Sequence, residues 1–212
     1  MRLLLIRHGQ THGNINRHLQ GDDDPLTELG RTQALVTGRY LAANESITHL
    51  YCSPLARAFE TASIIGNAIR HEPMVEPGLA EINIGVAAGT PFDVWMADNP
   101  QHIEQLRDPV TRMDFEWQGG ENGHAFRDRV FAAWDHIVNE HQGLNHVVAV
   151  VTHGGALAWI AARLQNLPDD TWPEDFFHNL SISEIDIARD GSTEVVAWNQ
   201  TRHLEEAGVT VT

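Results

Sequence analysis

The sequence has a single cysteine, Cys52, among its 212 residues. One cysteine excludes a framework of disulfides within the chain and fits a reducing compartment, so we expect a cytoplasmic protein. No apolar run approaches the roughly 20 residues that cross a bilayer. The apolar run near the N-terminus is also too short for a signal peptide. We therefore expect no membrane partner.

Cationic residues are scarce, because 14 lysines and arginines stand against 29 aspartates and glutamates and leave a net charge of −15. This balance argues against nucleic acid or an anionic membrane as a partner, since both are bound by cationic surfaces. Arginines that lie beside reactive residues then indicate a local site for a small anion. The sequence has no internal repeat and no interdomain linker, and its length predicts one domain over 1–212.

Several motifs that identify enzyme classes are missing. The sequence contains no Gly-x-Ser-x-Gly nucleophile elbow, no Walker loop, no Gly-x-Gly-x-x-Gly fingerprint and no His-Glu-x-x-His pair. Its 13 histidines leave a dispersed metal site open, but no tight cluster of ligands along the chain supports one.

Two apolar runs, however, each lead to a histidine that is followed by glycine. Leu3–Ile6 precedes His8, and Val147–Val151 precedes His153. Short apolar runs bounded by turn residues are typical of buried parallel strands. Open α/β sheets carry their chemistry just beyond the carboxyl ends of such strands. We therefore expect two imidazoles at one edge of one sheet.

Helical and extended patterns alternate along the rest of the chain. Thr27 predicts the N-cap of a helix with Val36 and Tyr40 on its apolar face. Ser53 and the proline after it predict the start of a second helix, with Arg57 in its first turn. Helices are also predicted on either side of the second apolar run.

Alternating apolar and polar residues predict a half-buried strand over Ile182–Ile187, and a short strand follows. Residues 91–118 carry aromatic side chains among polar ones, and we predict an insertion of short helices that covers the active site. We expect the tail after Arg202 to be loose. The order of elements predicts a three-layer α/β/α sandwich, with a mostly parallel central sheet and an antiparallel edge strand.

Two histidines and two arginines together suit a phosphate monoester. The guanidinium groups of Arg7 and Arg57 bind a phosphoryl dianion through planar, often bidentate hydrogen bonds. A neutral imidazole is a competent nucleophile toward phosphorus, and a second one stabilises charge on the transferred oxygens. A carboxylic acid would protonate the leaving alkoxide, but position alone does not distinguish Glu81 from an ordinary solvated glutamate.

Five segments in order resemble motifs of the histidine phosphatase superfamily, also called phosphoglycerate mutase-like. They are similar to RHGxTxxN, PLTxxGxxQA, SPLxRAxETA, LxExxxG and THGG, and they occupy residues 7–14, 25–34, 53–62, 79–85 and 152–155. The resemblance runs from Arg2 to about Ile185, which is most of the chain.

The resemblance implies roles for residues of this chain. His8 would be the nucleophile that forms a phosphohistidine, Glu81 the proton donor, and Arg7, Arg57 and His153 the groups that hold the phosphoryl group. The expected partner is a small anionic phosphorylated substrate, with no cofactor and no metal, and a homodimer is left open. The implied substrate-binding residues are Asn14, Gln20, Gly21 and Gly154.

Three functions remain open under the resemblance. They are a metal-independent phosphatase of small phosphomonoesters, a phosphoglycerate mutase that moves the phosphoryl group between 3- and 2-phosphoglycerate, and an inactive interaction module. An inactive module usually loses a core residue, and all five catalytic positions are present here. The mutase branch carries an Asn-Glu-Arg-x-Tyr-Gly run after its acid position, which this chain lacks after Glu81. We therefore expect a phosphoric monoester hydrolase.

The scarcity of cationic residues near the expected pocket also favours a hydrolase over a mutase. A mutase must hold a doubly phosphorylated intermediate away from water, which calls for extra cationic groups. Over residues 79–120 only Arg107 and Arg112 are basic, among many carboxylates. Residues 86–89 and Asn122 also depart from the superfamily pattern, and these departures bear on substrate preference. The mutase alternative is kept open by three side chains elsewhere, which are His12, Arg17 and His18.

Overall fold

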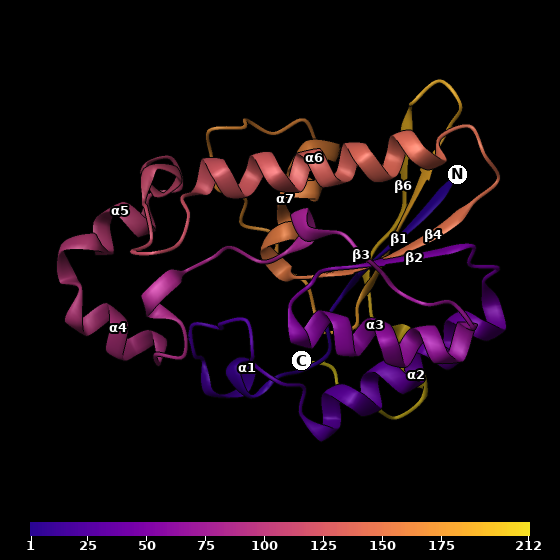
Figure 1. The fold of residues 1–212 in the computed structure, drawn as a ribbon, viewed down its shortest axis with the longest axis horizontal. Coiled ribbons are helices and arrows are strands. Elements are labelled where there is room, and N and C mark those ends of the chain that lie inside the picture. Colours follow the sequence, from indigo (N-terminus) through magenta and orange to yellow (C-terminus); the bar gives the residue numbers. More distant parts are fainter.

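The computed structural model describes all 212 residues and contains a six-stranded sheet with helices on both faces (Figure 1). The strand order is β3-β2-β4-β1-β5-β6. Strands β1 to β4 pair in parallel, whereas β5 runs antiparallel to β1 and to β6. The predicted three-layer, mostly parallel fold is confirmed, and its antiparallel edge has two strands. The bounds are β1 (Arg2–Arg7), β2 (His49–Cys52), β3 (Met74–Val75), β4 (Val147–Thr152), β5 (Ile182–Ile187) and β6 (Thr193–Gln200).

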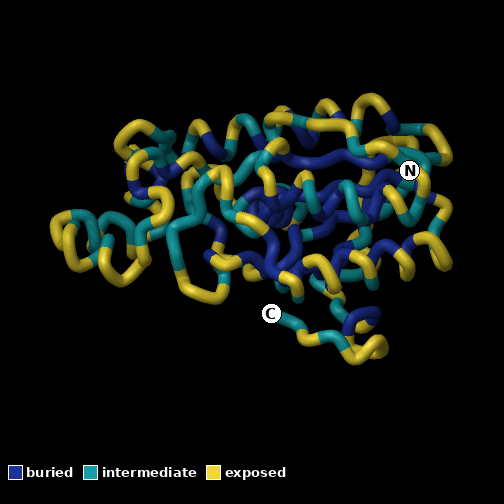
Figure 2. Tube along the Cα trace, turned by 60° about the horizontal axis from the view of Figure 1, so that its bottom comes forward, coloured by how far each residue is buried: buried dark blue, intermediate teal, exposed yellow.

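The apolar run of β1 is continuous because both faces of this strand are covered. Leu3 and Leu5 belong to the core under α6 (Gly123–His141) and α7 (Gly154–Leu164). Leu4 and Ile6 belong to the core on the other face, with α2 (Glu28–Asn44) and α3 (Ala56–Ile69). Burying each such side chain contributes about 1.5–3 kcal/mol, and the central strands are the buried part of the molecule in Figure 2.

Helix α2 begins where the sequence predicted but turns a different face inward. The Thr27 hydroxyl accepts the N–H of Gly30 at 2.9 Å, which confirms the N-cap. Tyr40, however, is 41% exposed, and the buried face carries small or polar residues such as Ala34 and Thr37. Small residues are needed because α2 packs closely on α3: a Cβ added at Gly38 would lie 3.0 Å from the Cβ of Ala68.

The predicted start of the next helix is wrong by two residues. Helix α3 begins at Ala56 with Leu55 at its N-cap and without a side-chain cap. Ser53 instead extends the path of β2, because its N–H donates to the carbonyl of Val151 at 3.0 Å. Because the backbone is extended here, the hydroxyl of Ser53 does not cap the helix and is free to bind a different group.

The tail is fixed rather than loose. It contains α8 (Arg202–Glu206), and Leu204 of that helix is fully buried. Near the C-terminus the carbonyl of Thr212 accepts the N–H of Asn179 at 2.8 Å, and the carbonyl of Thr210 accepts from Gln33 at 2.9 Å. The prediction failed because one buried leucine among charged residues gives little signal.

Residues 91–118 form the predicted short helices and extend beyond the end of the sheet (Figure 1). Trp95, Phe115 and Trp117 pack with ring centroids 5.0–6.1 Å apart, which gives the segment a small core of its own. No helix of the fold combines the length and apolar character needed to span a bilayer. The remaining helical elements are α1 (His12–Asn16), η1 (Pro77–Leu79), η2 (Gly85–Ala87), α4 (Phe92–Asp98), η3 (Pro100–His102), α5 (Ile103–Arg107) and η4 (Thr111–Asp114).

Candidate active site

The two predicted histidines meet at the carboxyl edge of the sheet. Arg7 of β1 is in register with Thr152 of β4, so the next residues of the two strands lie side by side. The ring centroids of His8 and His153 are 5.1 Å apart, and both residues are at most 1% exposed. The sheet therefore positions the pair that the sequence pattern predicted.

The hydrogen bond of His8 determines which of its nitrogens is free. Nδ1 lies 2.8 Å from the carbonyl oxygen of Gly9, and a carbonyl can only accept, so Nδ1 carries the proton. Nε2 of the neutral ring then keeps its lone pair. Burial, followed by the charges of Arg57 and Arg7, lowers the pKa of His8 well below its usual range. The ring is therefore a neutral nucleophile at pH 7.

His153 is held in the opposite sense. Its Nε2 lies 2.7 Å from the hydroxyl of Ser53, which also accepts the N–H of Leu55 at 3.2 Å. The serine hydroxyl has one proton, and the structure gives it no acceptor other than Nε2, so Ser53 donates to Nε2 and the imidazole proton sits on Nδ1. Burial, with the charges of Arg57, His8 and Arg7, lowers the pKa of His153 well below its usual range. His153 is thus a neutral hydrogen-bond donor through Nδ1.

Four buried donor nitrogens around His8 have no protein partner: Nε of Arg7, Nε and Nη2 of Arg57, and Nδ1 of His153. Each unpaired buried polar group costs about 1–3 kcal/mol, and more when it is charged. The arginines are anchored by their other nitrogens, with Arg7 donating to the carbonyl of Phe177 and Arg57 to that of Gly21. Such a set of fixed, unpaired donors suits a phosphoryl dianion.

Both guanidinium groups remain cationic. Burial lowers the pKa of Arg7 to about 10 and also lowers that of Arg57, while the nearby Glu81 opposes the change in both. A positive centre therefore exists within an acidic protein.

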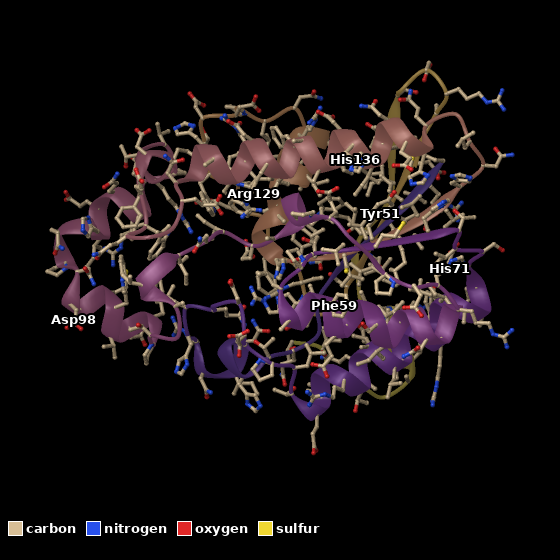
Figure 3. The ribbon with its side chains drawn as sticks, viewed as in Figure 1. Tyr51, Phe59, His71, Asp98, Arg129 and His136 are labelled. Atoms are coloured by element: carbon tan, nitrogen blue, oxygen red, sulfur yellow. The ribbon has the colours of Figure 1, made fainter.

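Glu81 is placed in the site by a network that sequence reasoning did not find. Its Oε2 accepts the N–H of Gly155 at 3.0 Å, at the start of α7. Arg129 of α6 donates to the carbonyls of Ala80 and Glu81 at 2.6 and 2.7 Å, and Thr152 donates to that of Leu79 at 2.6 Å (Figure 3). The loop that carries Glu81 is therefore fixed, and this glutamate is not an ordinary solvated one.

A pocket of about 320 Å³ opens onto these groups. Arg57 and His153 do not line it and are fully buried in contact with the groups that do. The segment over 172–177, which sequence analysis did not select, supplies several of the walls. Only the run of aromatic residues around Pro173 could have indicated it. The lining residues are Arg7, His8, Gln20, Glu81, Ile82, Arg112, Gly154, Gly155, Ala158, Trp172, Pro173, Asp175, Phe176 and Phe177.

The predicted substrate-binding residues fall into two groups. Gln20 and Gly154 line the pocket, and a Cβ at Gly154 would lie 3.6 Å from Nε of Arg7. Gly21 and Asn14 do not line the pocket but hold neighbouring groups in place by hydrogen bonds. The carbonyl of Gly21 holds Arg57, and Oδ1 of Asn14 accepts the Thr11 N–H at 3.1 Å and the Asn179 amide at 3.3 Å.

The three residues that kept the mutase alternative open, His12, Arg17 and His18, do not line this pocket. His12 and His18 line a separate cavity beside three aspartates. Arg17 is exposed and lies 3.8 Å from Asp93. Arg112 alone, from residues 91–118, lines the pocket.

Comparison with known proteins agrees with this geometry. Residues 3–201 match the model of the histidine phosphatase superfamily, branch 1. The chain is 30% identical over 208 residues to phosphoglycerate mutase-like protein 4 of Arabidopsis thaliana, a match that covers 97% of this chain and 88% of that protein.

Solved structures give the same family. A mycobacterial glucosyl-3-phosphoglycerate phosphatase superposes with a TM-score of 0.79 at 27% identity, covering 94% of this chain and 99% of that one. An alpha-ribazole phosphatase from Shigella flexneri gives a TM-score of 0.82 at 26% identity, covering 94% and 96%. The chain belongs to the histidine phosphatase superfamily.

Proposed function

We propose that this protein is a phosphatase that hydrolyses small phosphomonoesters through a phosphohistidine on His8, without a metal ion. The observation that carries the proposal is the neutral His8, with Nε2 free, beside four buried donor nitrogens that lack protein partners. These donors supply the charge stabilisation that a metal ion supplies in other phosphatases.

The first chemical step transfers the phosphoryl group to the protein. Nε2 of His8 attacks phosphorus, and the bond from phosphorus to the ester oxygen breaks. Glu81, protonated at this stage, gives its proton to the departing alkoxide. Arg7, Arg57 and His153 hold the phosphoryl oxygens throughout, and their contacts strengthen as charge develops.

The second step returns the protein to its first state. Water attacks phosphorus, the bond to Nε2 breaks, and the Glu81 carboxylate takes one proton from the water. Inorganic phosphate leaves, with His8 neutral and Glu81 protonated again. One fixed glutamate serves both steps because it faces the same oxygen position in each.

A phosphoglycerate mutase is the second candidate, and Arg112 is the observation that favours it. Arg112 lines the pocket with its guanidinium carbon 4.1 Å from the ring centre of Trp172. A cation at this position suits a second anionic group on the substrate. It is a single cation, however, and Asp175 lines the same pocket, so we favour transfer to water over retention of a doubly phosphorylated intermediate.

The test has two parts. A rapid quench with radiolabelled substrate is expected to trap an acid-labile, alkali-stable phosphoprotein that His8→Ala abolishes. A panel of phosphomonoesters is then assayed for phosphate release, and 3-phosphoglycerate for isomerisation with and without a 2,3-bisphosphoglycerate primer. We expect phosphate release from several monoesters in the presence of a chelator.

Two outcomes would contradict the proposal. If primed protein interconverts the phosphoglycerates much faster than it releases phosphate, the mutase assignment replaces it. If activity disappears with the chelator and returns with a divalent ion, the metal-independent mechanism is wrong.

A further inference from the structure

Three histidines meet at the end of the sheet opposite to the active site. His49 begins β2, His141 ends α6, and His146 lies just before β4. One ring nitrogen from each lies within 4.8 Å of the others. No tight ligand cluster is visible along the sequence because His49 is far from the other two histidines in the chain and all three lie at different elements.

His49 has one nitrogen fixed by a hydrogen bond and one free. Its Nδ1 lies 2.9 Å from the hydroxyl of Thr48, and that hydroxyl donates its own proton to the carbonyl of Val147 at 3.0 Å. The hydroxyl therefore accepts from Nδ1, and Nε2 of His49 keeps its lone pair. Metal-binding histidines are oriented in this way, with the second nitrogen donating to a neighbour.

His141 shows the same arrangement with the nitrogens exchanged. It is 1% exposed, and its Nε2 lies 3.0 Å from the hydroxyl of Tyr51 in β2. A proton on Nε2 that is donated to this hydroxyl leaves Nδ1 free. Nδ1 of His141 lies 2.9 Å from Nδ1 of His146. Two nitrogens so close either share one proton or bind one cation together.

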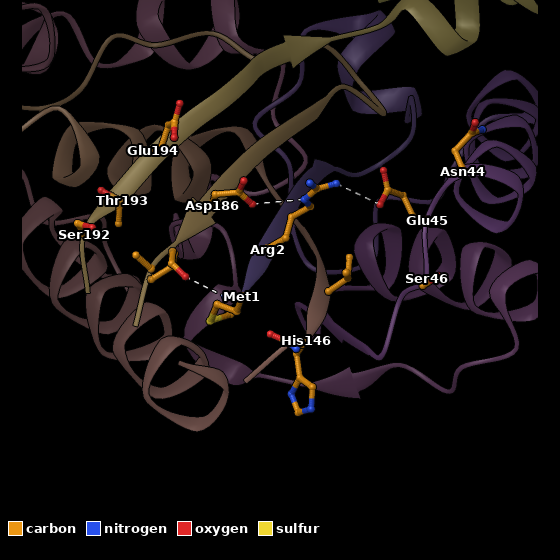
Figure 4. Close-up of a pocket in the computed structure, with 14 residues that line it drawn as sticks. Met1, Arg2, Asn44, Glu45, Ser46, His146, Asp186, Ser192, Thr193 and Glu194 are labelled. Atoms are coloured by element: carbon orange, nitrogen blue, oxygen red, sulfur yellow. Dashed lines mark hydrogen bonds and ion pairs between the residues drawn. The ribbon is translucent and has the colours of Figure 1, made fainter. Parts of the chain in front are cut away.

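His146 is anchored through its backbone and lies beside solvent. Its carbonyl accepts the N–H of Arg2 at 2.9 Å, which fixes it at the start of the sheet. It also lines a cavity of about 650 Å³ around Met1 and Arg2 (Figure 4). His49 and His146 are only half-buried, so solvent reaches the cluster.

We propose that His49, His141 and His146 bind a divalent first-row transition-metal ion such as Zn²⁺. Imidazole suits zinc, nickel and copper, and zinc takes three protein nitrogens with water in the fourth position. Zinc–nitrogen bonds of about 2.0–2.1 Å at tetrahedral angles place two ligand nitrogens about 3.4 Å apart. The observed separations lie on either side of this value, at 2.9 Å between the Nδ1 atoms of His141 and His146 and at most 4.8 Å across the cluster, so side-chain rotations bring the three nitrogens to one ion.

The local charges support this assignment. Glu140 precedes His141 in the chain, and its carboxylate lies close enough to the cluster to act on both His49 and His141. This negative charge favours a cation between the rings. The bound ion joins β2, the end of α6 and the start of β4, and so acts on stability.

Purified protein without an affinity tag is titrated with Zn²⁺ by calorimetry, and with Co²⁺ followed by absorption spectroscopy. We expect one ion per chain, a cobalt spectrum typical of nitrogen ligands, and a rise in Tm with Zn²⁺. His49→Gln and His146→Gln change half-buried rings, so they should fold while weakening binding at least tenfold. His136→Gln, on α6 but outside the cluster (Figure 3), should bind as wild type does.

A His8→Ala variant separates this site from the active site, since it should retain the bound ion. The proposal is wrong if no ion binds at 100 µM free Zn²⁺ or if the cluster variants bind as tightly as wild type. It is equally wrong if His8→Ala alone removes binding, because the ion would then belong to the active site. Failure of the phosphatase assignment would leave the metal measurements unchanged.

Discussion

The hydroxyl of Ser53 lies 2.7 Å from Nε2 of His153, although the two residues are 100 positions apart in the chain. The contact joins the end of β2 to the end of β4, which are neighbouring strands. Because Ser53 occupies Nε2, the imidazole proton is held on Nδ1, the nitrogen without a protein partner. Ser53 is therefore a positioning residue that selects the tautomer of His153.

Replacing Ser53 by alanine should lower kcat with little change in KM. The neutral ring of His153 could then carry its proton on either nitrogen, and the donor to the phosphoryl group would be lost for part of the time. A hydrogen bond contributes about 1 kcal/mol net, so we expect kcat to fall by about fivefold to tenfold. Steady-state kinetics of Ser53→Ala and Ser53→Thr measure this, and threonine should restore most of the activity.

Ser63→Ala is the matched control, because this serine lies on α3 and donates only to the carbonyl of Phe59. It should behave as wild type. An increase in KM for Ser53→Ala with unchanged kcat would contradict the tautomer argument and indicate a role in substrate binding.

Glu81→Gln should slow poor leaving groups far more than good ones. Glutamine keeps an oxygen that can accept the N–H of Gly155, but it has no proton to give. General acid catalysis contributes about 10²–10⁴-fold for an alkoxide, whereas p-nitrophenolate departs almost without a proton. The ratio of kcat on a sugar phosphate to kcat on p-nitrophenyl phosphate measures the effect.

Glu116→Gln, an exposed carboxylate of the insertion, is the control and should change neither rate. Equal losses of kcat on both substrates for Glu81→Gln would mean that Glu81 binds the substrate or supports the pocket and does not transfer a proton.

Much of this site could be predicted from sequence because strand ends are local features. The apolar run Leu3–Ile6 fixes β1 as a central strand, and a central parallel strand delivers His8 to the carboxyl edge of the sheet. The same reasoning holds for β4 and His153. The role of Glu81 could be inferred only from the resemblance to the superfamily. Its position in the site depends on Arg129, which is more than 40 positions away in the chain.

The residues that sequence analysis missed share a physical cause. The sequence predicts that Ser53 is a helix cap. Only the pairing of β2 with β4 shows that its hydroxyl contacts His153. The segment over 172–177 has no regular secondary structure, so no periodicity marks it as a pocket wall. Contacts of this kind depend on tertiary packing, which local patterns do not encode.

Arg112→Leu should change selectivity rather than catalysis. Arg112 lines the pocket and lies against the ring of Trp172. Charge-assisted hydrogen bonds contribute about 1.5–3 kcal/mol, so we expect KM to rise at least about tenfold for substrates with a second anionic group. A sugar phosphate that has no second anionic group should keep its KM. Measuring both KM values for each variant separates the effects.

Arg107→Leu removes a cation from the same insertion at a position outside the pocket and serves as the control. If Arg112→Leu raises KM equally for substrates with and without a second anionic group, Arg112 supports the pocket wall and does not bind that second group.

His203 should make the stability of the protein depend on pH. It is 7% exposed, and burial lowers its pKa from 6.5 to about 4. The unfolded chain therefore binds more protons than the folded one between pH 6.5 and about 4. Stability is complete above pH 6.5 and falls as the pH drops through this window, by up to about 3 kcal/mol from this group.

Urea unfolding at a series of pH values measures the effect, and His203→Gln should flatten the decline over this window without abolishing it, since His8 and His153 act in the same direction. Thr37→Val is the matched control. Its hydroxyl lies 2.9 Å from Nε2 of His203, so the change removes the hydrogen bond but leaves the buried imidazole. This control should be less stable at every pH and keep the wild-type slope. A His203→Gln variant with the full wild-type decline would show that His203 does not titrate as its burial requires.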